Sequence, residues 1–217
     1  MKSPLSPLFL TFFLFLALSA GPCAATPKAG VTDAGAPARC LAEAQHAIDQ
    51  AEVAAFERQV DVDAILEQAL DLVTQIMAQP ETADRMPPLL ALVFSQAAGN
   101  GGGTVRNLLK GEARAFILDG VASGAFAGRK PSGVGAGGLL APLFADASLG
   151  RKEIREVGAA VPDGEGWLVP FVVHDAGNGQ DYAVTGRFSP TETGCRLTSV
   201  ANLGELVERI RQEGMAP

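Results

Sequence analysis

The sequence is poor in the residues that most often perform chemistry or bind nucleic acid. Its 217 residues include two histidines, three cysteines, one tryptophan and one tyrosine. It has no CxxC or HExxH motif, so it gives no support for a zinc site, and it has no GxSxG nucleophile motif. Lys and Arg do not cluster and the net charge is −7, so the basic patch of a nucleic-acid-binding protein is missing. We therefore expect no metal, no cofactor and no nucleic-acid partner.

The rest of the composition is that of a globular protein. Hydrophobic residues make up 47% and charged residues 19%, which is unlike a disordered chain. Because aromatic residues are only 6%, the core must be built mainly from aliphatic side chains and Phe. The length suits one domain with a proper core.

The N-terminus has the order of features of a secretory signal peptide. Lys2 precedes an uncharged apolar run over 8–18, and small residues follow it. Cleavage is expected after Ala20 or after Ala25. We take residues 1–25 as the signal peptide and 26–37, which are small and turn-rich, as a flexible leader. The mature protein is expected to be exported, either periplasmic or secreted, and to have no membrane span.

Two alternatives to cleavage stay open. The first is an uncleaved membrane anchor, but the segment from Leu5 to Ala20 is shorter than the roughly 20 residues that span a bilayer. The second is a lipoprotein modified at Cys23, although Pro22 stands where such a site favours a small residue.

The cysteine count depends on the cleavage site. If cleavage follows Ala25, Cys23 is lost and Cys40 and Cys195 remain as an even pair, which commonly forms a disulfide in an oxidising compartment. Such a bridge would close a loop of about 155 residues, with an upper stabilisation of about 5 kcal/mol in the chain-entropy model. The alternative is two buried free thiols.

The first half of the mature chain, 38–149, has the periodicity of helices. A helix begins at Ala38 and breaks near Asp49 and Gln50. Asp61 or Asp63 can cap the next helix, whose apolar face runs from Val62 to Ile76. Further helices are expected over 89–98, 104–121 and 139–147, joined by glycine-rich connections.

In the second half the period changes to that of strands, with a final helix, over 150–213. Strands are expected over 154–161, 167–174, 182–189 and 195–201, separated by turns such as Asn178-Gly179. Pro170 favours an edge strand or a bulge in the second of these. Asn202 and Glu205 resemble a capping box that starts the last helix. The prediction is a single α+β domain over 38–217, with helices first, then an antiparallel meander of about four strands, then one helix.

A weak family resemblance accompanies this pattern. The stretches Ala47-Ile48-Asp49, Val53-Ala54-Ala55-Phe56 and Val60-Asp61, the Trp-bearing hairpin, and the closing run 196–203 (RLTSVANL) resemble small exported bacterial proteins of unknown function. Those proteins are similar to the nuclear-transport-factor-2-like or cystatin-like folds. The resemblance implies a curved sheet packed against helices, and it carries no active site across.

Few residues are candidates for a functional site. His174 is a weak candidate for a catalytic base, since histidine titrates near neutral pH. Its neighbour Asp175 is expected to point to the opposite face of a strand, so we do not expect the two to form a dyad by themselves. Trp167, Phe171 and Tyr182 are candidates for lining a pocket between sheet and helices, although core packing explains them as well. A GxGxxG pattern at 133–138 follows a predicted helix, where a flexible connection is favoured over dinucleotide binding.

Two functional hypotheses follow. The first is a non-catalytic binding or interaction module of the cell envelope, which binds an unknown protein partner or a small apolar ligand. The second is a small extracytoplasmic hydrolase or isomerase that uses His174 in a cavity between sheet and helices. The position of His174 on the sheet discriminates between them.

Overall fold

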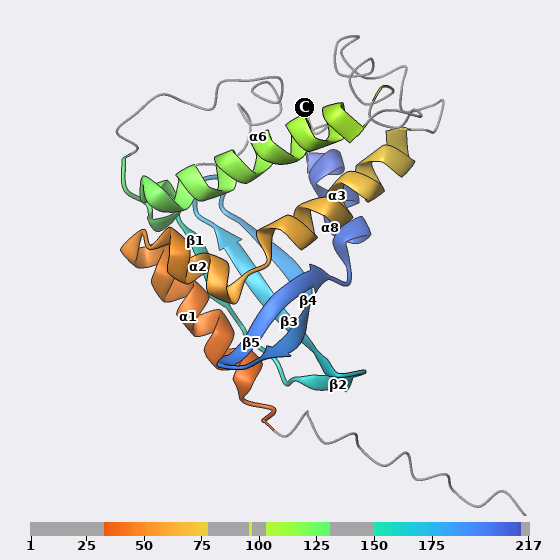
Figure 1. The fold of residues 1–217 in the computed structure, drawn as a ribbon. Helices are drawn as coiled ribbons and strands as arrows, with labels where there is room; N and C mark the ends of the chain where they lie inside the picture. Colours follow the sequence, from red (N-terminus) through yellow and green to blue (C-terminus); the bar gives the residue numbers. More distant parts are fainter. Residues whose placement is uncertain (1–32, 78–95, 97–102, 131–149, 214–217) are drawn as a thin grey trace, which may run out of the picture.

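The computed structural model describes residues 33–77, 96, 103–130 and 150–213 (Figure 1). Helices come first, a five-stranded antiparallel sheet follows, and a helix ends the domain, which confirms the predicted α+β class. The helical elements are α1 (Ala36–Gln50), α2 (Val53–Gln59), α3 (Val62–Met77), α6 (Gly103–Ala122), the 3-10 turn η1 (Ala125–Ala127) and α8 (Leu203–Glu213). The strands are β1 (Lys152–Arg155), β2 (Val161–Asp163), β3 (Gly166–Asp175), β4 (Gln180–Thr191) and β5 (Gly194–Val200).

Helix α1 begins with Pro37 in its first turn and buries one apolar face. It ends where Ala51 adopts a left-handed conformation with φ of 60°, and α2 starts two residues later. The break predicted near Asp49 and Gln50 is therefore confirmed. His46 lies on the exposed side of α1.

Of the two aspartates predicted to cap α3, Asp61 is the one that does so. Its Oδ1 accepts the N–H of Ala64 at 3.1 Å, whereas Asp63 lies in the first turn and faces α6. Helices α3 and α6 pack against each other above the sheet (Figure 1). The helix expected over 104–121 thus corresponds to α6, while those over 89–98 and 139–147 lie almost wholly outside the described residues.

The strands are ordered β1-β3-β4-β5, and β2 pairs with β3 on the same side as β1. Alternate residues of β3 face the helices, beginning with Trp167, Val169 and Phe171, and their partners on β4 include Phe188. These residues form a hydrophobic core with the first half of α1, while the second half of α1 packs with α2, α3 and α6 in a second core. We call this face of the sheet the inner face and the opposite one the outer face.

The strand expected over 154–161 is two strands, β1 and β2, with an irregular segment between them. Glu156 has a positive φ of 50°, and the N–H of Gly158 bonds to the carbonyl of Pro170 at 2.8 Å. Pro170 has no N–H for a ladder partner, so regular pairing cannot continue past it. This explains why β1 and β2 are separate elements along one side of β3.

Three side-chain amides occupy backbone groups at the borders of the sheet, and we call Gln45, Gln68 and Asn202 the edge amides. Gln45 accepts the Ile154 N–H at 2.8 Å beside β1. Gln68 of α3 pairs with both the N–H and the carbonyl of Val200 on β5, at 3.0 and 2.7 Å. Each amide takes the place of a neighbouring strand, which hinders edge-to-edge pairing with another chain.

Asn202 bonds to the sheet instead of capping α8, so the predicted capping box is wrong. Its Oδ1 accepts the N–H of Thr185 at 2.8 Å, and its Nδ2 donates to the carbonyl of Ala183 at 2.9 Å. Strand β5 ends at Val200, which leaves these groups of β4 without a strand partner. The need to satisfy those backbone groups decides the orientation of the Asn202 side chain.

Candidate functional site

The outer face of the sheet combines an apolar strip with a charged border. Because Trp167 and Phe171 point inward, their neighbours on β3 point outward. The residues of this face include Leu168, Pro170, Val172 and His174 on β3, Val161 on β2, Ala183, Thr185 and Arg187 on β4, and Glu153 and Arg155 on β1. None of these residues belongs to either hydrophobic core of the described residues.

The apolar part of the outer face is accessible to solvent. Val161 is 56% exposed, and Pro170 and Ala183 are also exposed, while Leu168 and Val172 are half-buried. Val161 lies directly opposite Leu168 in the register of β2 and β3, so the two side chains form one continuous strip. An apolar strip with a polar border is typical of surfaces that contact another macromolecule.

Ion pairs form the border of this strip. Arg155 pairs with Glu153 at 2.5 Å, and Arg187 pairs with Asp163. The hydrogen bond from Arg155 holds the pKa of Glu153 below its ordinary value, so this carboxylate is ionised at neutral pH. The border therefore presents charges of both signs.

His174 lies on the outer face within a row that crosses three strands. Glu153 on β1 and Asp181 on β4 are its direct register partners, and its Nδ1 is 2.7 Å from Oδ1 of Asp181. The carboxylate that orients His174 is thus seven residues away in sequence, on the other strand of the hairpin. In the sequence, only the alternation of strand residues could have indicated that Asp181 lies beside His174. Within the described ranges, no three His, Cys, Asp or Glu side chains are placed to hold a metal ion.

Each of the three predicted pocket residues contacts other side chains of the structure. Trp167 and Phe171 are buried in the core beneath α1. Tyr182 is half-buried, its ring lies 5.3 Å from the guanidinium of Arg209, and its hydroxyl accepts a hydrogen bond from Asn178 at 2.8 Å. Core packing accounts for the first two, and contacts with α8 and the hairpin turn account for the third.

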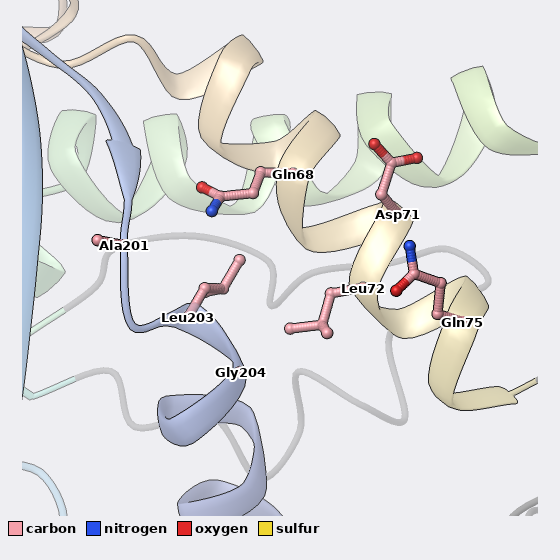
Figure 2. Close-up of a pocket in the computed structure, with 7 residues that line it drawn as sticks. All are labelled: Gln68, Asp71, Leu72, Gln75, Ala201, Leu203 and Gly204. Atoms are coloured by element: carbon pink, nitrogen blue, oxygen red, sulfur yellow. The ribbon is translucent and has the colours of Figure 1, made fainter. Parts of the chain in front are cut away.

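A cavity of about 260 Å³ lies elsewhere, between α3 and the start of α8 (Figure 2). In this view Gln68 and Leu72 of α3 extend toward the turn that leads into α8, whereas the carboxylate of Asp71 points away from it. The lining residues are Gln68, Asp71, Leu72, Gln75, Ala201, Leu203 and Gly204. The sequence did not indicate this cavity, because it forms where two helices distant in the chain meet. Its lining mixes polar side chains such as Gln68 and Asp71 with the apolar Leu72 and Leu203, and none of the three predicted pocket residues belongs to it.

Cys40 and Cys195 are buried side by side as free thiols. Sγ of Cys40 lies 3.1 Å from the carbonyl oxygen of Cys195. The structure therefore brings together the two cysteines that the sequence pairs.

Other predicted features fall outside the described residues. These are the signal peptide, Cys23, most of the leader and the GxGxxG pattern. Across the ranges that are described, no helix is both long and apolar enough to span a bilayer.

Comparison with known proteins finds no match to a family model, to a curated protein or to a solved structure. The resemblance to nuclear-transport-factor-2-like or cystatin-like domains therefore stays a prediction, and the functional argument depends on the surface itself.

Proposed function

We propose that this protein is exported and acts outside the cytoplasm as a non-catalytic module that binds a protein partner through the outer face of its sheet. The observation that carries the proposal is the exposed apolar strip around Val161 and Leu168, bordered by ion pairs. Burial of such a strip against a partner removes apolar surface from water, and the charged border can select the orientation of the partner.

Export is supported by the signal-like N-terminus, with Lys2 before the apolar run and Ala20 and Ala25 as cleavage positions. The pairing of Cys40 with Cys195 belongs to the same proposal, because disulfides persist in oxidising compartments. An exported binding module of the periplasm or the medium fits both features.

A protein partner is favoured over a small apolar ligand. A small apolar molecule needs a concave site that buries most of its surface. Trp167 and Phe171 are already packed against α1, and neither of them lines the described cavity beside Gln68 and Asp71. A sheet face with an apolar strip instead suits a second macromolecular surface.

The edge amides restrict how the partner binds. Gln45 and Gln68 occupy backbone groups at opposite borders of the sheet, where an added strand would have to pair. Recognition through side chains of the outer face is therefore favoured over addition of a partner strand.

Photocrosslinking in the native envelope fraction tests this proposal. A photoreactive residue at Val161 should give a crosslinked species, whereas the same residue at Leu108 of α6 should not, although Leu108 is 48% exposed and equally apolar. Ala183→Glu, which places a charge on the strip, should abolish crosslinking from position 161. Equal crosslinking from both positions, or crosslinking that Ala183→Glu leaves unchanged, would show that the strip is not the binding surface.

The contact between His174 and Asp181 favours a second candidate function, a small hydrolase or isomerase. In many enzymes the histidine that acts as general base is oriented by a carboxylate at its Nδ1, and Asp181 lies at Nδ1 of His174. His174→Ala should abolish turnover in a screen of ester, amide and glycoside substrates, while Asp181→Asn should reduce it. Because this pair lies on the outer face and does not line the described cavity, we rank this function second.

A further inference from the structure

The two buried cysteines join the first helix to the last strand. Cys40 lies in α1 and is 3% exposed, and Cys195 lies in β5 and is 4% exposed. Helix α1 packs along β5 at the border of the sheet (Figure 1). Besides the carbonyl of Cys195 at 3.1 Å, the Cys40 thiol contacts Oε1 of Gln59 at 3.3 Å.

We propose that Cys40 and Cys195 are the redox site of this protein, oxidised to a disulfide before α1 docks on the sheet and protected from further exchange once it has docked. This inference rests on the proposed function in one respect: export brings the chain to a compartment that supplies the oxidant. The oxidant is a disulfide-containing compound or enzyme outside the cytoplasm. Two S–H bonds break and one S–S bond forms, and the oxidant takes up two electrons and two protons to become a dithiol.

Proximity supports the bridge. Sγ of Cys40 lies 3.1 Å from the carbonyl oxygen of Cys195, so the two residues are neighbours although their thiols are free and not covalently bonded to each other. A disulfide therefore requires the two side chains to turn toward each other. Strand β5 is also held to the helical region two residues further on, where Leu197 accepts the N–H of Asp61 at 2.8 Å. The bridge therefore fits the packing of α1 against β5.

The exchange proceeds through a mixed disulfide. Because it takes place before α1 docks, the contacts of the folded state do not decide which sulfur reacts first. The thiolate of one cysteine attacks the oxidant, and the other cysteine then attacks the mixed disulfide at the sulfur of the first, which releases the reduced oxidant.

Burial determines when this exchange can occur. Neither sulfur is accessible to a dissolved oxidant while α1 covers β5, because both residues are less than 5% exposed. Oxidation is therefore fast in the folding chain and slow in the folded one, where it requires local opening of α1. The same cover protects the finished bridge from reductants.

Refolding with oxidised glutathione tests the site independently of export. The full chain with Cys23→Ser has only these two cysteines, and after refolding with oxidised glutathione it should show no alkylatable thiol when denatured without reductant. Added to the folded, reduced protein, the same reagent should act at least ten times more slowly. Two alkylatable thiols, or stable glutathione adducts on both cysteines, would overturn the site, and equal rates would overturn its protection by α1.

Cys40→Ser is the matched control, because it keeps a donor to the Cys195 carbonyl and cannot form the bridge. Oxidised protein should unfold at a higher urea concentration than its reduced form. The urea midpoint of Cys40→Ser should not change with oxidised glutathione or with a reductant. If Cys40→Ser matches the oxidised protein in its urea midpoint, Cys40 serves only as a hydrogen-bond donor and the redox site is refuted.

The protein recovered from the native envelope separates this inference from the proposed function. A bridge that forms during refolding, while the native protein keeps an intact Met1 and free thiols at Cys40 and Cys195, would refute export and leave the redox site standing. A native protein that is cleaved but fully reduced would support export and overturn the bridge in the mature protein.

Discussion

Helices α1 and α6 contact the rest of the molecule in opposite ways. Helix α1 buries a full apolar face, including Cys40, Leu41 and Ile48, whereas α6, although longer, buries only Leu109, Gly120 and Val121. Helix α6 is attached largely by charge. Its cations Arg106, Lys110 and Arg114, spaced four residues apart, meet carboxylates of α2 and α3 that include Glu57, Asp63, Glu67 and Asp71.

The difference teaches that helical periodicity alone does not reveal what a helix packs against. In both segments apolar residues recur at helical spacing, so the pattern alone does not distinguish them. For α6 the polar positions face other helices. Because ion pairs at the surface contribute little free energy and apolar burial contributes much, the two helices should differ sharply in their sensitivity to mutation.

The largest effect is expected at the interface of α1 with the sheet. Leu41 is 3% exposed and packs in the core with Trp167, so Leu41→Ala leaves a cavity and should lower the free energy of unfolding by about 2–5 kcal/mol. The matched change Leu108→Ala on α6 should cost under about 0.5 kcal/mol, because Leu108 is exposed. Urea unfolding followed by tryptophan fluorescence measures both. Similar losses for the two variants would contradict the comparison.

An intermediate effect is expected at Gln68, whose side chain joins α3 to the end of β5. Gln68→Met keeps the length of the side chain and removes both hydrogen bonds to Val200, leaving backbone groups at the end of β5 unsatisfied, which should cost about 1–3 kcal/mol. Gln75→Met, two turns further along α3 at an exposed position, is the control and should be nearly neutral. Amide hydrogen exchange at Val200 should speed up in the first variant alone.

Local patterns predicted most of the fold, and long-range contacts explain what they missed. The helices around Ile48, Val62 and Leu109 and the hairpin at Asn178 follow from periodicity and turn chemistry. The split of one expected strand into β1 and β2 depends on Pro170, which lies on the neighbouring strand, so no property of segment 154–161 alone indicates it.

The candidate surface was less predictable than the fold. His174 was identified from its residue type, but its partner Asp181 required the register of the hairpin. The outer strip was not identified, because Val161 and Leu168 read as ordinary strand residues until the structure shows which face the helices cover. Asn202 was assigned to a helix cap, since only tertiary structure places its amide beside β4.

The smallest effect is expected in the ion pairs between α3 and α6. Arg106 donates to Glu67 at 2.8 Å and to Asp71 at 2.8 Å, and Arg106→Met should cost less than about 1 kcal/mol because both carboxylates are largely exposed. Lys130→Met removes the same charge at an exposed residue outside these pairs and is the control. Urea midpoints of the two variants should differ at low salt and converge at about 1 M NaCl, where charges are screened.

The pH dependence of this pair has a definite sign. The hydrogen bond from Arg106 lowers the pKa of Glu67, so the folded state binds this proton more weakly than the unfolded state does. The stabilisation by the pair is therefore complete above the unfolded-state pKa of about 4.3 and is lost as the pH falls through the lower folded-state value. Arg106→Met should consequently lose stability relative to the parent at neutral pH and lose less once Glu67 is protonated, when only the contact of Arg106 with Asp71 remains. A stability difference between the two proteins that stays constant across that range would mean that Arg106 acts through packing of its aliphatic chain, and α6 would then resemble α1 more closely than its charges suggest.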